Sequence, residues 1–359
     1  MKIAKIKGFK TVLICLIVFS LIILPACTPE KDNEVTLPVG EEIITLKIAH
    51  FMPQQHFFHT NIIEPFIEEV EILTEGRIIF NVRPFSTLAS PDALYDMAAT
   101  GIADITISLQ GYTPWKFPVS SVVELPFICD SSEMGTEILY ELYNKFPEIQ
   151  EEYKDTKVLW LFQNDPEYLM MVDEEIHSLD DLNELKMRTG TGVTYEAVHA
   201  WGGLPILMPI NDVYSAVRSR AIDGATGPLS ALESFDLSDV FNIYIGGPFT
   251  IANFFVVMNK STWEKLSPQD QEIFESLAEK YRKLTSVEFD KAGKRALENA
   301  IGNGATYIQL SEDEQKRFED SLSDVYQDWV DLVKKKGIPG EEILEEVRRL
   351  SSEYKNNRQ

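Results

Sequence analysis

Residues 94–107 read LYDMAATGIADITI, a helical spacing of apolar residues that ends at Gly101 and gives way to strand-like alternation. The pattern returns in residues 211–225, NDVYSAVRSRAIDGA. Asp104 matches Asp223, and each stretch predicts a helix, a tight turn and a strand that begins at an acid. A duplication separated this far predicts two α/β lobes of similar construction. We expect a small molecule to bind in the cleft between them.

Strands and helices alternate along the rest of the chain. A strand at residues 43–49, a helical stretch at 62–73 and a strand at 76–82 form a β-α-β opening. Further strands are expected at residues 157–162, 168–172 and 253–258. This alternation is typical of the α/β class.

A long helix is expected to begin at Ser267, which can cap it, with Pro268 at its first position. No stop signal follows before Gly302, which predicts about 34 residues and a length of roughly 50 Å. Such a helix is longer than one small lobe, so we expect it to pass along both. The alternative is two helices with a break near Gly293, because glycine weakens a helix interior.

The N-terminus has the features of an export signal. Lysines precede an apolar run at residues 12–24, which is shorter than the roughly 20 residues of a membrane-spanning helix. This order predicts a signal peptide over residues 1–26. The following Leu24-Pro25-Ala26-Cys27 resembles a bacterial lipobox, so Cys27 is the expected lipid attachment site and residues 27–41 a polar tether. We expect an extracytoplasmic, lipid-anchored protein; ordinary secretion with an unmodified Cys27 is the alternative.

The formal net charge is −24 at pH 7, which excludes nucleic acid as a partner. The overall field would repel an anionic ligand, so its cleft must supply local positive charge. After removal of the signal peptide and lipidation of Cys27, only Cys129 is left, and no intramolecular disulfide is possible. A large core in two lobes must then stabilise the chain, which we expect to be a monomer.

Three histidines raise an enzymatic alternative. His50, His56 and His59 lie close together in the sequence, as the ligands of a metal-dependent exported hydrolase could. No HExxH pattern, cysteine ligand or nearby acidic cluster completes the set, and no GxSxG motif, P-loop or GxGxxG motif after a strand is present. We therefore expect no metal, no cofactor and no enzymatic activity.

Arg188 is the strongest binding candidate. It ends a short expected strand, residues 185–188 (LKMR), and precedes a turn of Thr189 and Gly190. A planar guanidinium at such a position suits a carboxylate. The spacing alone equally allows a surface arginine or a salt bridge between the lobes.

Several motifs together make the sequence recognisable. In order they are Gly76-Arg77-Ile78, Gly101-Ile102-Ala103-Asp104-Ile105, Gly111-Tyr112-Thr113-Pro114 with Phe117-Pro118, Leu125-Pro126-Phe127, Leu185-Lys186-Met187-Arg188-Thr189 and Ile222-Asp223-Gly224. They resemble the motifs of the extracytoplasmic substrate-binding proteins of TRAP transporters, DctP type, over essentially the whole chain after the signal peptide.

The resemblance implies an α/β, two-lobe periplasmic-binding-protein-like fold of the type II class, with the long helix spanning both lobes. We assign residues 42–161 plus 254–290 to lobe I and residues 162–253 plus 291–355 to lobe II. The implied function is the capture of a small organic acid, a carboxylate, in the interlobe cleft and its delivery to the membrane subunits of a TRAP transporter. Binding is expected to close a hinge between the lobes.

By the family's pattern, Arg188 holds the ligand carboxylate. Thr226-Gly227-Pro228 stands in the place of a frequent Glu-Asn-Pro, and Gly227 lacks the amide of that asparagine. A larger or more apolar ligand could fill the gap. Candidate walls are Phe51, Met52, Trp115, Phe249 and Phe254. Lys116 stands where the family often has an arginine.

The residues expected to contact the ligand are Arg188, Gln55, His56, Ser86, Thr87, Gln110, Tyr112, Asn164, Asn211, Thr226, Gly227 and Phe249. Besides the hydrolase, three alternatives stay open at this point. They are a binding protein of another transporter class, a partner of a chemoreceptor, and a structural surface lipoprotein without a cleft ligand.

Overall fold

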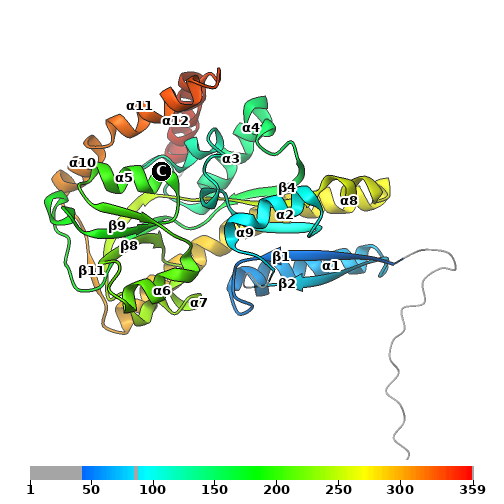
Figure 1. The fold of residues 1–359 in the computed structure, drawn as a ribbon, viewed down its shortest axis with the longest axis horizontal. Helices are drawn as coiled ribbons and strands as arrows, with labels where there is room; N and C mark the ends of the chain where they lie inside the picture. Colours follow the sequence, from blue (N-terminus) through cyan, green and yellow to red (C-terminus); the bar gives the residue numbers. More distant parts are fainter. Residues whose placement is uncertain (1–42, 85–87, 358–359) are drawn as a thin grey trace, which may run out of the picture. The chain divides into compact units, whose positions relative to one another are not determined.

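The computed structural model describes residues 43–84 and 88–357. The expected signal peptide (1–26) and the tether (27–41) with Cys27 lie outside the described residues, as do Ser86 and Thr87. Two sheets, each flanked by helices, organise the described chain (Figure 1). Within the described ranges, no helix combines the length and the apolar character that crossing a bilayer requires.

Sheet A has five strands in the described chain, in the order β2-β1-β3-β10-β4. Their bounds are β1 Ile44–His50, β2 Ile78–Arg83, β3 Ile105–Leu109, β4 Thr156–Gln163 and β10 Asn253–Asn259. β1 pairs in parallel with β2 and β3, whereas β10 is antiparallel to β3 and β4. With α1 (Glu64–Leu73), β1 and β2 form the expected β-α-β opening.

Sheet B has six strands in the described chain, in the order β11-β9-β5-β8-β6-β7. Their bounds are β5 Glu167–Met171, β6 Lys186–Thr189, β7 Leu204–Leu207, β8 Gly224–Pro228, β9 Ile243–Thr250 and β11 Thr306–Ile308. The chain passes from sheet A to sheet B between β4 and β5 and returns between β9 and β10. The two-lobe α/β architecture is therefore confirmed.

The duplicated pattern folds as two helix-turn-strand units. The first forms α2 (Leu94–Thr100) and β3, and the second forms α6 (Ile210–Arg218) and β8. Left-handed backbone follows each helix, at Gly101 with φ 76° and at Arg220 with φ 58°. Glycine adopts this conformation freely, so only the first unit has the residue that the turn favours.

The two matched aspartates do the same structural work. The Asp104 carboxylate accepts the backbone N–H of Lys47 on β1 at 2.8 Å. The Asp223 carboxylate accepts the backbone N–H of Lys186 on β6 at 2.8 Å. Each aspartate thus ties the turn before its own strand to the parallel neighbouring strand, which explains why the acid recurs in both units.

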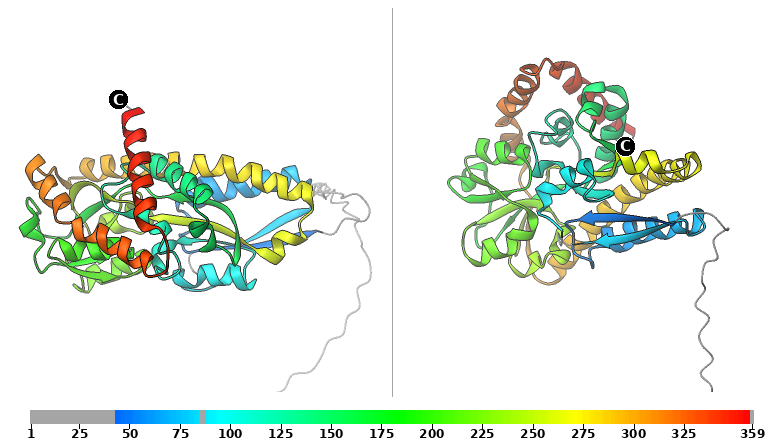
Figure 2. Two further views of the ribbon diagram at one scale, coloured as in Figure 1. Left: turned by 90° about the horizontal axis from the view of Figure 1, so that it is seen from above. Right: turned by 45° about the vertical axis from the view of Figure 1, so that its right-hand side comes forward.

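A single long helix, α9 (Pro268–Gly302), runs for 35 residues and confirms the expected start, at which the Ser267 hydroxyl caps the first turn. It continues through Gly293 without a break. A Cβ at Gly293 would lie 2.3 Å from Oδ2 of Asp165, so glycine stands there because a buried carboxylate needs the space. α9 packs against α1 and β4, and also against α7 (Ala231–Ser234), which follows β8; it is the yellow-to-orange helix in Figure 2.

The remaining helices flank the sheets. They are η1 His59–Ile63, η2 Pro91–Ala93, η3 Gln110–Tyr112, η4 Ser120–Glu124, α3 Ser132–Lys145, α4 Pro147–Glu151, η5 Leu179–Leu182, α5 Gly192–Ala200, η6 Leu237–Asp239, α8 Lys260–Lys265, α10 Glu312–Asp320, α11 Ser323–Lys334 and α12 Gly340–Asn357. α12 packs against α3 and α11. α3 also covers β4 of sheet A, so α12, whose residues were assigned to lobe II, lies beside elements assigned to lobe I. The residue boundaries of the lobes stay a prediction.

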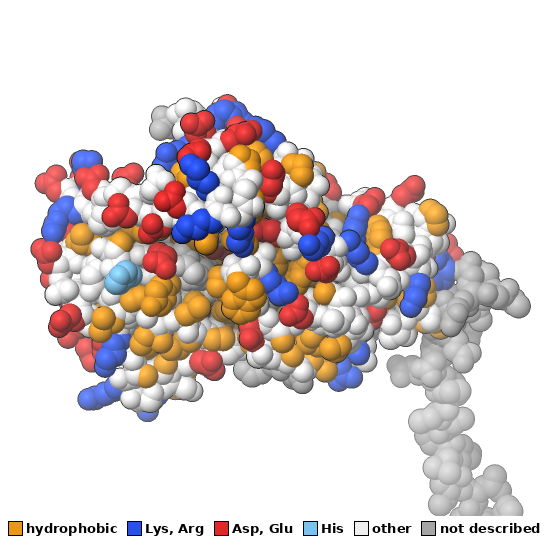
Figure 3. Space-filling view, turned by 45° about the horizontal axis from the view of Figure 1, so that its top comes forward, with side chains coloured by type: hydrophobic (Ala, Val, Ile, Leu, Met, Phe, Trp, Pro, Cys, Tyr) orange, Lys and Arg blue, Asp and Glu red, His pale blue; other side chains and the backbone are white. Residues whose placement is uncertain are grey.

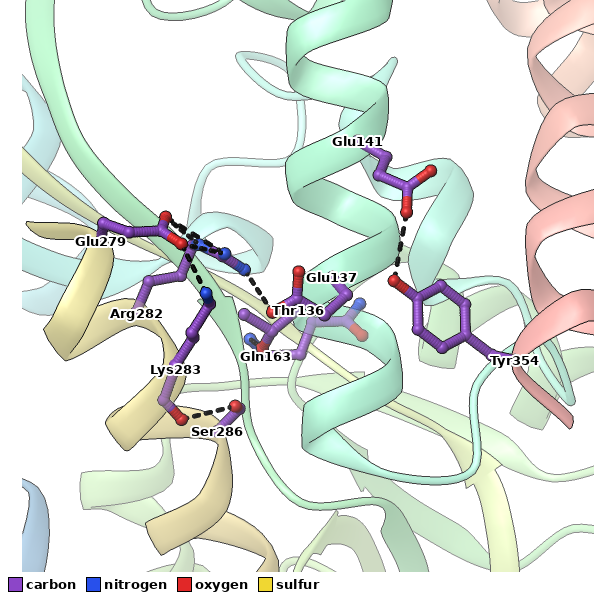
Figure 4. Close-up of polar contacts among 9 residues, drawn as sticks. All are labelled: Thr136, Glu137, Glu141, Gln163, Glu279, Arg282, Lys283, Ser286 and Tyr354. Carbon is purple, nitrogen blue, oxygen red and sulfur yellow. Dashed lines mark hydrogen bonds and ion pairs between the residues drawn. The ribbon is translucent and has the colours of Figure 1, made fainter. Parts of the chain in front are cut away.

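Polar contacts join α3, α9 and α12 beside the outer strand β4 (Figure 4). Arg282 of α9 donates to Glu137 of α3 at 2.7 Å and pairs with Glu279 on its own helix at 3.2 Å. The Tyr354 hydroxyl of α12 donates to Glu141 of α3 at 3.1 Å. These contacts hold α9 and α12 against α3, and α3 and α9 both pack against β4.

Charges of both signs are interspersed over the face drawn in Figure 3, with hydrophobic side chains gathered in patches between them. The net charge of −24 therefore does not make this face uniformly acidic. An anionic ligand must still find a directed cation, and Arg188 provides one in the interior.

Candidate ligand-binding cleft

Arg188 lies on β6 between β7 and β8 and is only 2% exposed. Its Nε donates to the Met208 carbonyl at 3.0 Å and its Nη1 to the Thr226 carbonyl at 2.9 Å. A Cβ at position 190 would lie 3.1 Å from Nη2, so Gly190 leaves the guanidinium room. The side chain is thus held in place by backbone oxygens, and a buried cation of this kind favours a negatively charged partner.

The guanidinium faces a cavity with about 470 Å³ of empty space, part of it open to solvent. Sheet A and the segments after its strands contribute one wall, and β8, α7 and the turns around them contribute the other. The apolar lining includes Phe51, Met52, Leu109, Phe235, Phe254 and Phe289. The polar lining includes His56, Tyr112, Asn164, Glu167, Arg188 and Ser230. This mixture of apolar walls and a few polar groups is typical of a site for a small organic molecule.

Aromatic rings dominate the apolar wall. Phe51 stacks on Phe254 with ring centroids 6.2 Å apart and meets Tyr112 edge-on at 5.5 Å. Phe254 in turn lies 6.1 Å from Phe289 on α9. Phe235 from the turn after α7 meets His56 edge-on at 5.8 Å. Such walls favour a flat apolar ligand body over a highly hydroxylated one.

Two hydrogen bonds link the lobes beside the cavity. The Tyr112 hydroxyl accepts the Ile210 N–H at 3.1 Å, and Asn211 Nδ2 donates to the Phe51 carbonyl at 3.3 Å. Burial raises the pKa of Tyr112, and the nearby Arg188 charge opposes that rise. The phenol is therefore neutral at physiological pH and can accept or donate within the cleft.

Four of the expected ligand contacts line this cavity: Arg188, His56, Tyr112 and Asn164. Gln55 lines a separate hollow with Asn61 and Arg295, and Gln110 is buried and bonded to Ser120 and Tyr153. Ser86 and Thr87 lie outside the described residues. Asn211, Thr226 and Gly227 lie next to the cavity lining.

Gly227 offers little free space at the place of the missing amide. A Cβ there would lie 2.8 Å from Met170 Cε and 3.7 Å from Arg188 Nη1. Phe249 is packed between Trp201 at 5.3 Å and Phe318 at 5.5 Å.

The expectation that Trp115 forms a wall of the cleft is corrected, and the place of its neighbour Lys116 is now defined. Trp115 is 68% exposed and does not line the cavity. Lys116 pairs with Asp96 of α2 at 2.8 Å rather than facing the cavity. The loop that carries both residues turns toward solvent and α2.

The sequence reasoning missed Glu167, Ser230, Phe235 and Phe289. Glu167 is 2% exposed, and its Oε2 accepts the Thr250 hydroxyl at 3.3 Å. Burial raises its pKa, while the charge of Arg188 and hydrogen bonds from Thr250, Thr226 and Asn164 lower it. The available signal was an acid directly before the apolar strand at residues 168–172.

The three histidines are used structurally. His50 Nε2 and His59 Nδ1 share a hydrogen bond at 2.9 Å, and His56 Nδ1 accepts the Phe58 N–H at 3.1 Å. Burial and the neighbouring histidines lower the pKa of His50 and of His56 to about 3, so both are neutral at pH 7. In the described part of the chain, no cluster of three or more histidine, cysteine or acidic residues is arranged to hold a metal.

Residues 48–331 match the model of the DctP family, bacterial extracellular solute-binding protein family 7. The chain belongs to this family. Membership confirms the resemblance found in the sequence and identifies a solute-binding protein of the TRAP type rather than an enzyme.

Solved structures agree with the DctP assignment. One is a marine metagenome TRAP solute-binding protein specific for aromatic acid ligands, in complex with metahydroxyphenylacetate. It is 27% identical with a TM-score of 0.83, and the match covers 87% of this chain and 99% of that one. Another, from Rhodoferax ferrireducens with copurified benzoate, is 26% identical with a TM-score of 0.83, over 88% of this chain and 100% of that one.

Curated DctP relatives are more distant. The outer membrane transporter protein TsaT of Comamonas testosteroni is 23% identical over 327 residues, which cover 90% of this chain and 96% of the relative. The ectoine-binding periplasmic protein TeaA of Halomonas elongata is 24% identical over 74% of this chain and 78% of the relative. These relatives and the family place the DctP chain outside the cytoplasm.

Proposed function

We propose that the protein captures a small organic acid with an aromatic body beside Arg188 and delivers it to the membrane subunits of a TRAP transporter. The observation that carries this proposal is a buried guanidinium facing a cavity whose apolar lining includes four phenylalanines. An arginine fork binds a carboxylate through two parallel N–H···O bonds, and the walls can enclose a ring.

A direct contact with the Arg188 guanidinium stabilises a bound carboxylate more than the diffuse electrostatic field of the protein does. A carboxylate loses its hydration on entering a closed cleft, and only a charge-assisted pair compensates that loss. Two backbone carbonyls already orient the Arg188 guanidinium, so little side-chain entropy is lost when the ligand arrives.

Ligand binding and lobe closure are coupled in this proposal. The cavity is lined from both lobes, and Tyr112–Ile210 and Asn211–Phe51 hydrogen bonds join the lobes beside it. A ligand that contacts both walls stabilises the closed state relative to an open one. The transporter could then distinguish loaded from empty protein by shape.

Two relatives support the aromatic choice. The solved structures at 27% and 26% identity hold metahydroxyphenylacetate and benzoate respectively. His56, Tyr112, Asn164 and Arg188 are the proposed ligand contacts in this chain, and the other expected contacts stay predictions. We also propose that residues 1–26 are removed, that Cys27 is lipidated and that the protein works as a monomer, supported by the export signal read from the sequence.

Mass spectrometry of small acids that copurify with the protein tests this function, followed by a thermal-shift panel of benzoate, 3-hydroxybenzoate, succinate and glucuronate. We expect the aromatic acids to raise the melting temperature most, because a ligand specific to the folded state stabilises it. Stabilisation by succinate or glucuronate alone would contradict the aromatic ligand class.

A further inference from the structure

A second ionisable side chain shares the cavity with Arg188. Glu167 is the first residue of β5, where it pairs with Pro228 of β8 and Thr250 of β9. Arg188 is on β6, on the other side of β8. Both side chains line the cavity and both are 2% exposed.

Groups from several elements surround the Glu167 carboxyl. The Thr250 hydroxyl donates to its carboxylate at 3.3 Å, and Thr226 and Asn164 also bond to it. Its charged and titratable neighbours are Arg188 on β6, Tyr112 after β3 and Glu124 on η4. Arg188 attracts the ionised form, whereas burial opposes it.

The charged side chains that line the cavity determine which ligand charge is favoured. Arg188 is the permanent cation among the described lining residues, since the other basic side chain there, His56, is neutral. In the empty cleft, an ionised Glu167 offsets the Arg188 charge. A bound carboxylate would place a second negative charge beside the same guanidinium. Two carboxylates that share a desolvated site do not both stay ionised, because their repulsion raises one pKa strongly.

We propose that Glu167 determines the charge class of the ligand: it takes up a proton when a carboxylate pairs with Arg188, and it excludes ligands that carry a second negative charge. This inference rests on the proposed function and narrows it to monocarboxylates. The apolar walls contribute no second cation for an extra carboxylate, and the acid that lines the cavity repels one.

The proposal fixes the direction of the pH dependence. Below the pKa of Glu167 in the empty cleft, Glu167 is already protonated, and affinity for a monocarboxylate does not vary with pH. Above that pKa, binding must take up a proton, so affinity falls with rising pH, by up to about tenfold per pH unit for one proton per ligand.

Calorimetry with benzoate and terephthalate, from pH 5.5 to 8.5, tests the proposal on the wild-type protein and on Glu167→Gln. Each titration is repeated in two buffers of different ionisation enthalpy, which gives the number of protons taken up. For the wild type we expect benzoate affinity to fall toward high pH with close to one proton bound. For Glu167→Gln we expect no pH dependence, benzoate binding at least about tenfold tighter than wild type at pH 8.5, and a smaller preference for benzoate over terephthalate.

A matched control is Glu124→Gln. Glu124 is also a buried glutamate, but it does not line the cavity, and a glutamine oxygen can still accept the Asn253 N–H that Glu124 accepts at 2.7 Å. We expect this variant to keep the wild-type pH profile of binding. Loss of the pH dependence in Glu124→Gln would show that a different carboxyl takes up the proton and would overturn the proposal.

The remaining outcomes distinguish this inference from the proposed function. Benzoate binding to the wild type without proton uptake would overturn this inference and leave the proposed function intact. Weaker benzoate binding by Glu167→Gln at every pH would also overturn it, because Glu167 would then hold a donor group of the ligand. Failure of all aromatic acids to bind would reject the proposed function, and the inference with it. The proton count needs only wild-type protein, so it decides the question even if Glu167→Gln does not fold.

Discussion

Arg188 illustrates how far the role of a single residue can be predicted. Its position at the end of a short strand, and the family pattern around it, indicate a carboxylate-binding role from the amino-acid sequence alone. The fold adds that the side chain is buried and fixed by the Met208 and Thr226 carbonyls. Those partners lie far away in the sequence, so spacing could not have predicted them.

Replacement of Arg188 should cause the largest loss of affinity of any single substitution in the cleft. Removing one partner of a buried charge pair costs about 2 to 5 kcal/mol, so Arg188→Ala should weaken benzoate binding by about thirtyfold to a few thousandfold. Arg188→Lys should recover part of the loss, because an ammonium lacks the planar fork. Calorimetry measures both, with the exposed Arg218→Ala as the matched control. A fall of less than about threefold for Arg188→Ala would show that the carboxylate is held elsewhere.

Elements were easier to predict than their contacts. The duplicated stretch gave both helix-turn-strand units, because apolar spacing depends on local geometry. The start and the length of α9 followed from its cap and from the lack of a stop signal. The role of Gly293 did not, because Asp165 comes against it only after the chain has crossed between the sheets.

The long helix offers a test of this packing. Alanine usually stabilises a helix relative to glycine by about 0.5 to 1 kcal/mol. At Gly293 the added Cβ would lie 2.3 Å from the Asp165 carboxylate, so we expect Gly293→Ala to lower the free energy of unfolding by about 1 to 3 kcal/mol instead. Gly302→Ala at the end of the same helix is the control, because nothing lies within 4 Å of its Cβ position. Urea unfolding compares them, and equal stabilities for the two variants would contradict the packing argument.

At the scale of the whole molecule, several buried groups titrate far from their ordinary values. Burial raises the pKa of Glu124 to about 8 and the pKa values of Glu152 and Asp165 to about 7. These acids hold protons in the folded chain that the unfolded chain has released, so the free energy of unfolding decreases as pH rises from about 4 to about 8. His50 and His56 have the opposite effect between about pH 3 and pH 6.5, because burial lowers their pKa.

Above about pH 6.5, His50 and His56 no longer change the free energy of unfolding with pH. The three buried acids alone then determine how it varies. We therefore expect urea unfolding without ligand to show a falling free energy of unfolding between pH 6.5 and pH 8.5. Glu124→Gln should flatten this fall, because the group with the highest of these pKa values is removed. An unchanged slope in Glu124→Gln would contradict the assignment.

Anchoring is the other prediction that concerns the whole molecule. Cys27 follows an apolar leader in a lipobox-like sequence, so Cys27→Ser should move the protein from the membrane fraction to the soluble fraction and should remove the mass of the lipid. Fractionation and intact-protein mass spectrometry read out the two changes. The same membrane fraction and the same mass for both proteins would reject lipidation.

The cleft shows where sequence reasoning reaches its limit. His56, Tyr112, Asn164 and Arg188 could be found because they follow or end strands that meet at the cleft. Glu167 was missed because an acid before an apolar strand is usually solvent-exposed, and only the three-dimensional arrangement places it in the same cavity as Arg188. Trp115 was offered as a wall, but its loop points it to solvent.

Sheet A is completed by a strand from late in the chain. β10 (Asn253–Asn259) lies between β3 and β4, so residues 44–163 leave a gap within their own sheet until residue 259 arrives. In a chain that emerges from its N-terminus, the facing edges of β3 and β4 therefore stay unpaired from the arrival of residue 163 until residue 259 follows. The five-stranded sheet therefore cannot be completed before about residue 259 is available, however early its first four strands emerge.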